Sequence, residues 1–147
     1  LKRTLLAVAD KALTSTSADA LSLRDVARRA GVSHTAPYKH FRDKSSLLRA
    51  LVEYEFRTLR ELTLDSAWRF PDQLSLQLRA VAEHWTQIAL YHPRKMQLMT
   101  DLAKEFTPEQ ISAFEQLGLT QEKAQLFWVA LLGTSLALSA DSMGLFI

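Results

Sequence analysis

The sequence contains no cysteine, which excludes a disulfide-stabilised scaffold, and its four glycines and four prolines are too few for collagen-like or low-complexity sequence. The longest apolar stretch, residues 127–140, has 14 residues, whereas crossing a bilayer takes about 20. No segment combines the basic start, apolar core and small-residue cleavage site of a signal peptide. We therefore expect a cytoplasmic protein with no membrane partner. Leu1 already lies inside an apolar-periodic run, so we expect the natural chain to begin upstream of it.

The features of an enzyme or a metal site are missing as well. There is no glycine-rich loop that could cradle a phosphate, and no two histidines stand four residues apart on a helix as a zinc site would need. Asp101 and Glu105 would share a helical face, but the adjacent Lys104 makes a solvated charged face the simpler interpretation. We expect neither catalysis nor a bound metal or cofactor.

Charge is divided unevenly along the chain, although the net charge is only +2. Residues 1–60 hold 12 Lys and Arg against 6 Asp and Glu, whereas residues 61–147 hold 6 against 10. A basic front on an acidic body is typical of a protein that faces a polyanion such as nucleic acid. A surface of internal salt bridges would give the same counts.

Apolar residues recur at three- and four-residue spacing throughout, and no run alternates with a period of two. His92-Pro93 breaks one helical stripe, because proline disfavours helical geometry in the residue before it and suits a first helical position itself. Thr107-Pro108-Glu109-Gln110 has the pattern of another helix start, with the threonine as its cap, a first-turn proline and a glutamine three residues after the cap. The sequence predicts an all-α protein of seven or eight helices.

Residues 21–51 contain strong signals for helix starts and stops. Ser22 is placed to cap a helix, and Asp25 three residues later is placed to complete a capping box. Gly31 can take the left-handed conformation that reverses the chain, and Ser33 is placed to cap the next helix. Two short helices joined by a glycine turn predict a helix-turn-helix, whose second helix enters the major groove of DNA.

The same segment resembles the DNA-binding domain of TetR/AcrR-type transcriptional regulators, in which a turn glycine precedes a recognition helix ending in Tyr-x-His-Phe. That tail is Tyr38-Lys39-His40-Phe41 here, and Asp43-Lys44 opens a long helix after it. The resemblance implies a three-helix DNA-binding domain over residues 1–46, joined by the long helix to a helical effector-binding and dimerisation domain over residues 47–147. Pro37 departs from the family pattern, in which an aliphatic residue is commoner at this position.

The resemblance also implies which side chains contact DNA. Hydroxyl, imidazole and ammonium groups donate to phosphate oxygens. The candidates for this contact are Ser22, Tyr38, His40 and Lys44. The candidates for reading base edges are Arg24, His34, Thr35, Ala36 and Lys39. Some of these five can simply face water, and Tyr38 can instead be a core aromatic with an exposed hydroxyl.

The resemblance implies that the second half of the chain binds an effector and forms a dimer. Trp85, Met96, Met99 and Trp128 are candidates to line a pocket for a flat or greasy molecule, with ordinary core packing as the alternative. Residues 124–138 are apolar almost all round the helix. One side would meet the helix's own core, and the other a second copy of the chain.

Together these features predict a homodimeric repressor that binds a palindromic double-stranded DNA operator, since two helix-turn-helix units about one turn apart read an inverted repeat. The resemblance further implies that a small-molecule effector would relieve the repressor from its operator. The alternative is a small-molecule-binding or protein-interaction helical bundle whose helix-turn-helix no longer binds DNA. The salt dependence of DNA affinity separates the two, because only phosphate binding makes it steep.

Overall fold

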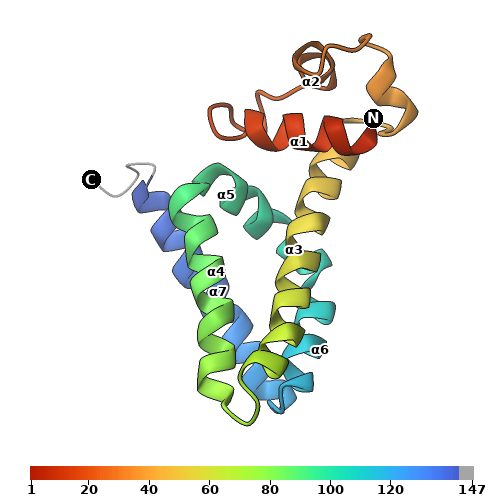
Figure 1. The fold of residues 1–147 in the computed structure, drawn as a ribbon. Helices are drawn as coiled ribbons and strands as arrows, with labels where there is room; N and C mark the ends of the chain where they lie inside the picture. Colours follow the sequence, from red (N-terminus) through yellow and green to blue (C-terminus); the bar gives the residue numbers. More distant parts are fainter. Residues whose placement is uncertain (143–147) are drawn as a thin grey trace. The chain divides into compact units, whose positions relative to one another are not determined.

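The computed structural model describes residues 1–142, and every regular element in them is helical (Figure 1). In chain order the elements are α1 (Lys2–Ala12), α2 (Leu23–Arg29), η1 (Ala36–Lys39), α3 (Lys44–Arg69), α4 (Leu74–Tyr91), α5 (Pro93–Leu102), η2 (Ala103–Glu105), α6 (Thr107–Gln116) and α7 (Gln121–Ser142). The two η elements are short 3₁₀ helices, and the all-α prediction is confirmed. Backbone contacts divide the chain into two compact units, Leu1–Glu53 and Tyr54–Ile147.

The boundary between the two units lies inside α3. Leu47, Leu48, Leu51 and Val52 in the first turns of this helix are buried and belong to the first unit. The boundary expected from the sequence, between residues 46 and 47, lies in the same helix and closer to its start. A continuous helix contains no turn or linker residues at such a boundary. Sequence patterns therefore indicate where the helix begins, and not the residue at which it passes from one unit to the other.

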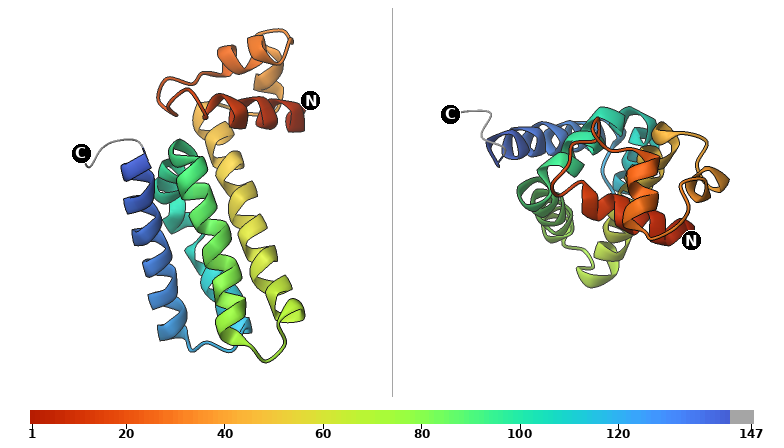
Figure 2. Two further views of the ribbon diagram at one scale, coloured as in Figure 1. Left: turned by 60° about the vertical axis from the view of Figure 1, so that its left-hand side comes forward. Right: turned by 90° about the horizontal axis from the view of Figure 1, so that it is seen from above.

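The core of the first unit is built from small and aliphatic side chains. α1 contacts α2, and α2 contacts η1 (Figure 2). Leu5, Ala9, Val26 and Ala27 are fully buried, and Phe41, which follows η1, is 3% exposed. The small side chain of Ala27 allows its neighbours to approach α2 closely. The segment between α2 and Phe41 is therefore fixed at both of its ends.

The second unit packs the rest of α3 with α4 to α7. α7, blue in Figure 1, contacts α4, α5 and α6. Phe56, Trp85, Phe114 and Trp128 are its largest fully buried side chains. The predicted break at His92-Pro93 is confirmed, because α4 ends at Tyr91 and α5 begins at Pro93.

The prediction that Thr107 caps a helix is wrong. Thr107 is the first residue of α6 itself, and its hydroxyl donates to the carbonyl of Ala103 at 2.9 Å. The same hydroxyl oxygen accepts the indole N–H of Trp128 at 3.0 Å. A buried indole N–H needs an acceptor, so the tertiary contact with Trp128 determines what the Thr107 hydroxyl does.

α7 has one buried and one exposed face, and both are apolar. Ala124, Trp128 and Leu131 are buried, whereas Leu126 and Val129 are each 65% exposed. By length and composition alone its segment Gln121–Ala140, with a mean hydropathy of 1.2, could cross a membrane, a test that a core helix of a soluble protein also passes. Only 28% of that segment is buried, so much of its apolar surface is uncovered by the described residues.

Candidate nucleic-acid interface

The turn after α2 has the conformation that the sequence predicts. Gly31 adopts a φ of +68°. The N–H of Gly31 donates to the carbonyl of Arg28 at 3.2 Å, and the N–H of Val32 donates to the carbonyl of Ala27 at 3.1 Å. This pair of bonds is a Schellman motif, which needs a left-handed residue at the position of Gly31. The chain therefore leaves α2 in a defined direction.

The segment after the turn is shorter and tighter than the predicted recognition helix. It forms η1, in which the N–H of Tyr38 donates to the carbonyl of Thr35 at 3.2 Å. The predicted Ser33 cap is wrong, because the Ser33 hydroxyl lies against Thr35 Oγ1 at 3.2 Å and bonds no backbone N–H of the helix. Pro37 has no N–H with which to bond the Ser33 carbonyl four residues back, and the turn tightens to the three-residue pattern of a 3₁₀ helix.

η1 buries one side and exposes a polar one. Pro37 forms the buried side of η1, and Tyr38, the next residue, is 51% exposed. The exposed residues among the other predicted contacts of this segment are His34, Thr35, Lys39 and His40, and Ala36 is half-buried. Such exposure of Tyr38 disfavours the alternative of a core aromatic that shows only its hydroxyl. Five candidate side chains are thus accessible over seven consecutive positions.

The start of α2 places two more candidates at the surface. The predicted Ser22 cap is confirmed, since Ser22 Oγ accepts the N–H of Asp25 at 3.1 Å. The hydroxyl proton of Ser22 remains available to donate. Arg24 in the first turn is exposed.

The Asp25 carboxylate binds arginines and does not complete the predicted capping box. It pairs with Arg28 and, at 2.6 Å, with Nε of Arg29. The hydrogen bonds from Arg28 and then from Arg29 hold the pKa of Asp25 below its ordinary value of 3.8. Two guanidinium groups outcompete one backbone N–H for the carboxylate because hydrogen bonds between charged groups are stronger.

Lys44, the last phosphate candidate, is the first residue of α3 and is half-buried. Its Nζ donates to the carbonyl of Asp19 at 2.6 Å. An ammonium has three N–H donors, so an anchored Lys44 keeps donors for a phosphate oxygen. The N-terminus of α3 is capped reciprocally. Asp43 Oδ1 accepts the N–H of Ser46 at 2.8 Å, and Ser46 Oγ accepts the N–H of Asp43 at 3.1 Å. This cap was not predicted from the sequence.

The first unit carries the positive charge of the chain. Residues 1–53 hold 10 Lys and Arg against 5 Asp and Glu. The Arg28 side chain stays 73% exposed despite its ion pair with Asp25. The exposed polar face of η1 therefore belongs to a unit with excess positive charge, which attracts phosphate at long range.

The four residues predicted to bind an effector lie in the core of the second unit. Trp85, Met96 and Met99 are 0% exposed, and Trp128 is 2% exposed. The ring centroids of the two tryptophans are 5.6 Å apart. Both indole N–H groups are bonded, that of Trp85 to the carbonyl of Leu131 at 3.1 Å. All four side chains therefore pack in the core, which was the alternative to lining a pocket. That they bind an effector stays a prediction.

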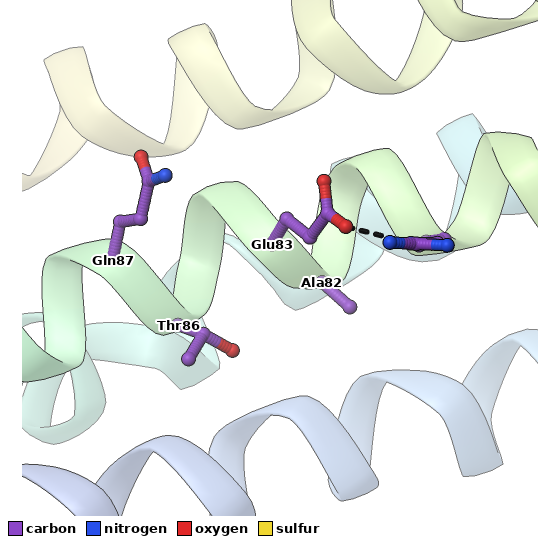
Figure 3. A pocket seen from close by; sticks show the side chains of 5 residues that line it. Ala82, Glu83, Thr86 and Gln87 are labelled. Atoms are coloured by element: carbon purple, nitrogen blue, oxygen red, sulfur yellow. Dashed lines mark hydrogen bonds and ion pairs between the residues drawn. The ribbon is translucent and has the colours of Figure 1, made fainter.

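Two surface hollows lie elsewhere in the second unit. One, of about 420 Å³, follows α4 from Arg79 to Gln87, and Figure 3 shows its side chains with the Arg79–Glu83 ion pair at 2.6 Å. The other, of about 270 Å³, is lined by Arg60, Leu64, Pro108, Glu109, Ser112 and Gln116 of α3 and α6. None of the four predicted effector residues lines either hollow. Within residues 1–142, no group of three or more His, Cys, Asp or Glu could hold a metal ion.

An aromatic cluster with a buried amide was missed by the sequence analysis. Phe56 stacks on Phe106 with ring centroids 4.9 Å apart and lies 5.8 Å from both Trp85 and Trp128. Gln110 is 1% exposed and donates from Nε2 to the carbonyl of Phe56 at 2.9 Å. The one available signal was the spacing of Gln110 from the apolar Ala113 and Phe114, which places a polar side chain on the buried face of α6.

Comparison with known proteins relates this geometry to a family. Residues 5–51 match the family described as bacterial regulatory proteins, tetR family. The HTH-type transcriptional regulator AcrR of Shigella flexneri is 33% identical over 96 residues, which make up 65% of this chain and 44% of that regulator. The chain thus aligns with less than half the length of this curated relative.

Two solved structures share the fold of nearly the whole chain. A TetR-family transcriptional regulator from Pectobacterium atrosepticum has a TM-score of 0.72 at 19% identity, over 99% of this chain and 91% of that one. The TetR family repressor AlkX from a Dietzia species, implicated in the biodegradation of n-alkanes, has a TM-score of 0.62 at 20% identity, over 96% of this chain and 83% of that one. The predicted fold class, a helix-turn-helix joined by a long helix to a helical bundle, is confirmed.

Proposed function

We propose that this chain belongs to the TetR family of bacterial regulatory proteins, and that it is a sequence-specific DNA-binding transcriptional repressor that a small-molecule effector releases from its operator. The observation that carries the proposal is the exposed polar face of η1, which follows a defined glycine turn on a unit with excess positive charge. A protein that regulates bacterial genes acts in the cytoplasm, where the chromosome lies.

Four side chains would fix the register on the DNA backbone. Tyr38 and His40 donate from η1 and its end, and Lys44 donates from the positive end of α3. Ser22 donates its hydroxyl proton while its oxygen still accepts the N–H of Asp25. Such contacts hold the protein in place without reading sequence.

A subset of the five candidates would read the base edges. Lys39 and Arg24 suit the O6 and N7 acceptors of guanine, and the methyl groups of Thr35 and Ala36 suit the thymine methyl. His34 can donate or accept. η1 is a single tight turn, so few side chains reach the groove from one subunit. Specificity then needs a second subunit on an inverted repeat.

The apolar outer face of α7 supports a homodimer through the C-terminal helices. Leu126, Val129 and Leu136 are exposed on this helix, and Gly133, between them, would let two helices approach closely. A two-fold interface would cover the face in both copies at once. Effector binding in the second unit would then change the separation of the two η1 elements and weaken their joint fit to one face of the operator.

The test of DNA binding is the salt dependence of affinity for duplex DNA. The wild-type chain is expected to show a steep linear fall of log affinity with log salt, and Lys44→Ala should reduce the slope by about one per subunit. Lys104→Ala removes the same charge from an exposed residue of the second unit and should leave the slope unchanged. A flat response in the wild type would favour the alternative, a helical bundle that no longer binds DNA.

A further inference from the structure

Gln110 holds a buried polar atom that its surroundings leave unsatisfied. Its Nε2 donates to the carbonyl of Phe56 at 2.9 Å, but its Oε1 has no hydrogen-bond partner and the side chain is only 1% exposed. Exchanging the two ends of the amide gives no relief, because the oxygen would then face a carbonyl oxygen. A carboxamide oxygen carries no proton, so only an incoming donor can satisfy it.

Other buried polar groups differ from Gln110 in this respect. Gln77 makes the same kind of bond, from Nε2 to the carbonyl of Phe70 at 2.8 Å, and leaves no orphaned buried oxygen. His84 Nε2 is the other orphaned atom in the described part of the chain, but an imidazole can move its proton between its two nitrogens. Gln110 is therefore the group with a fixed, unmet need for a donor.

The surroundings of Gln110 define what such a donor would be attached to. The Phe56 carbonyl that Gln110 binds belongs to the residue whose ring contacts Phe106, Trp85 and Trp128. Both indole N–H groups already have acceptors within the protein. The buried polar side chains of the described residues are Thr63, Ser66, Gln77, Gln110, Ser135 and Ser139. None of these is ionisable, so a charged ligand would find no counter-charge among them.

A surface hollow lies along the same pair of helices. It has a volume of about 270 Å³ and opens between α3 and α6. Pro108 and Glu109, which directly precede Gln110 in the chain, line it together with Leu64 of α3. Pockets for drug-sized ligands occupy roughly 300–1,000 Å³, so a ligand would widen the contact between α3 and α6 as it enters.

We propose that Gln110 Oε1 is the polar anchor of a ligand site in the α3–α6 core, and that the site takes a neutral aromatic molecule with one hydrogen-bond donor, of the phenol or indole type. The flat ring of such a ligand would make ring–ring contacts of the kind that the aromatic cluster around Phe56 already makes. The single hydrogen-bond donor of the ligand would satisfy Gln110 Oε1. That this ligand is also the effector rests on the proposed regulatory function, whereas the ligand site itself does not.

The test compares two probes of equal shape by equilibrium dialysis against the full chain. 1-Naphthol carries a hydroxyl where 1-methylnaphthalene carries a methyl group. The wild type is expected to bind 1-naphthol at least about tenfold more tightly, because only the hydroxyl satisfies the buried acceptor. Gln110→Met keeps the volume of the side chain and should bind both probes equally. Gln77→Met, the matched control, should keep the preference.

Equal affinity of the wild type for both probes, or binding of neither, would overturn the proposal, and this comparison needs no variant to fold. A preference that survives in Gln110→Met, or disappears equally in Gln77→Met, would overturn it too. The same preparations are titrated with duplex DNA. A preference for 1-naphthol without DNA binding would support the ligand site and contradict the proposed regulatory function. DNA binding without that preference would support the regulatory function and contradict the ligand site.

Discussion

At the scale of single residues, Asp25 limits the positive charge that the first unit presents. Its carboxylate pairs with both Arg28 and Arg29 on the surface of α2. These bonds lower the pKa of Asp25, so their stabilising effect is present at pH values above the ordinary 3.8 and is lost only as the pH falls below it. At neutral pH the carboxylate is fully charged, and both arginines are held along the helix.

Asp25→Asn is therefore expected to increase affinity for non-cognate DNA, because it removes one negative charge and releases two guanidinium groups for phosphate. The salt slope on a non-cognate duplex should become steeper by about one to two per subunit. Fluorescence anisotropy at neutral pH measures both quantities.

Asp65→Asn is the matched control for this change. Asp65 pairs with Arg69 at 2.6 Å in the second unit, so the substitution makes the same charge change away from the candidate interface. It should alter neither the affinity nor the slope. An equal gain in both variants would mean that net charge, and not the release of Arg28 and Arg29, is responsible.

At the scale of elements, the turn between α2 and η1 depends on one backbone conformation. Gly31 has a φ of +68°, and a Cβ added there would meet nothing within 4 Å. The requirement for glycine is thus conformational and not a matter of space. A left-handed conformation costs an L-residue roughly 1–2 kcal/mol, and asparagine tolerates it better than alanine.

Gly31→Ala should destabilise the first unit by about 1 kcal/mol, and Gly31→Asn should cost less. Hydrogen exchange of the α2 amides measures the local free energy of opening, with the α4 amides of the second unit as internal reference. If the two variants proved equal to the wild type, the turn would tolerate another conformation and would not fix the direction of η1.

The sequence predicted those elements whose signals are local. The Ser22 cap, the Gly31 turn and the Pro93 helix start each depend on a few neighbouring residues, and the structure has them where they were expected. The Thr107 cap failed because a tryptophan 21 residues away uses its hydroxyl. For Gln110 the sequence predicted a place in the capping pattern and not its buried hydrogen bond, because its partner, the Phe56 carbonyl, lies 54 residues away. Tertiary partners of this kind leave no trace in a local pattern.

At the scale of the whole molecule, the proposed regulator would act as two copies of the chain together. The outer face of α7 exposes Leu126 and Val129 at 65% each, and such apolar surface is stable in water when a partner covers it. A single η1 element covers little DNA, so the same dimer would provide the second reading element.

Val129→Glu is expected to turn the dimer into a monomer, because it would bury an unpaired charge at the centre of the interface. Sedimentation equilibrium over a range of concentrations measures the change. Trp68→Glu is the control, since Trp68 is 87% exposed at the end of α3 and lies outside α7. A wild-type chain that is monomeric at all concentrations would refute the interface.

The most direct measurement of the central claim is selection of bound duplexes from a randomised DNA pool at a salt concentration that suppresses non-specific binding. The wild type should enrich an inverted repeat with half-sites about one helical turn apart. Lys39→Ala should enrich the same repeat with one position in each half-site relaxed. Failure of the wild type to enrich any inverted repeat would contradict the account.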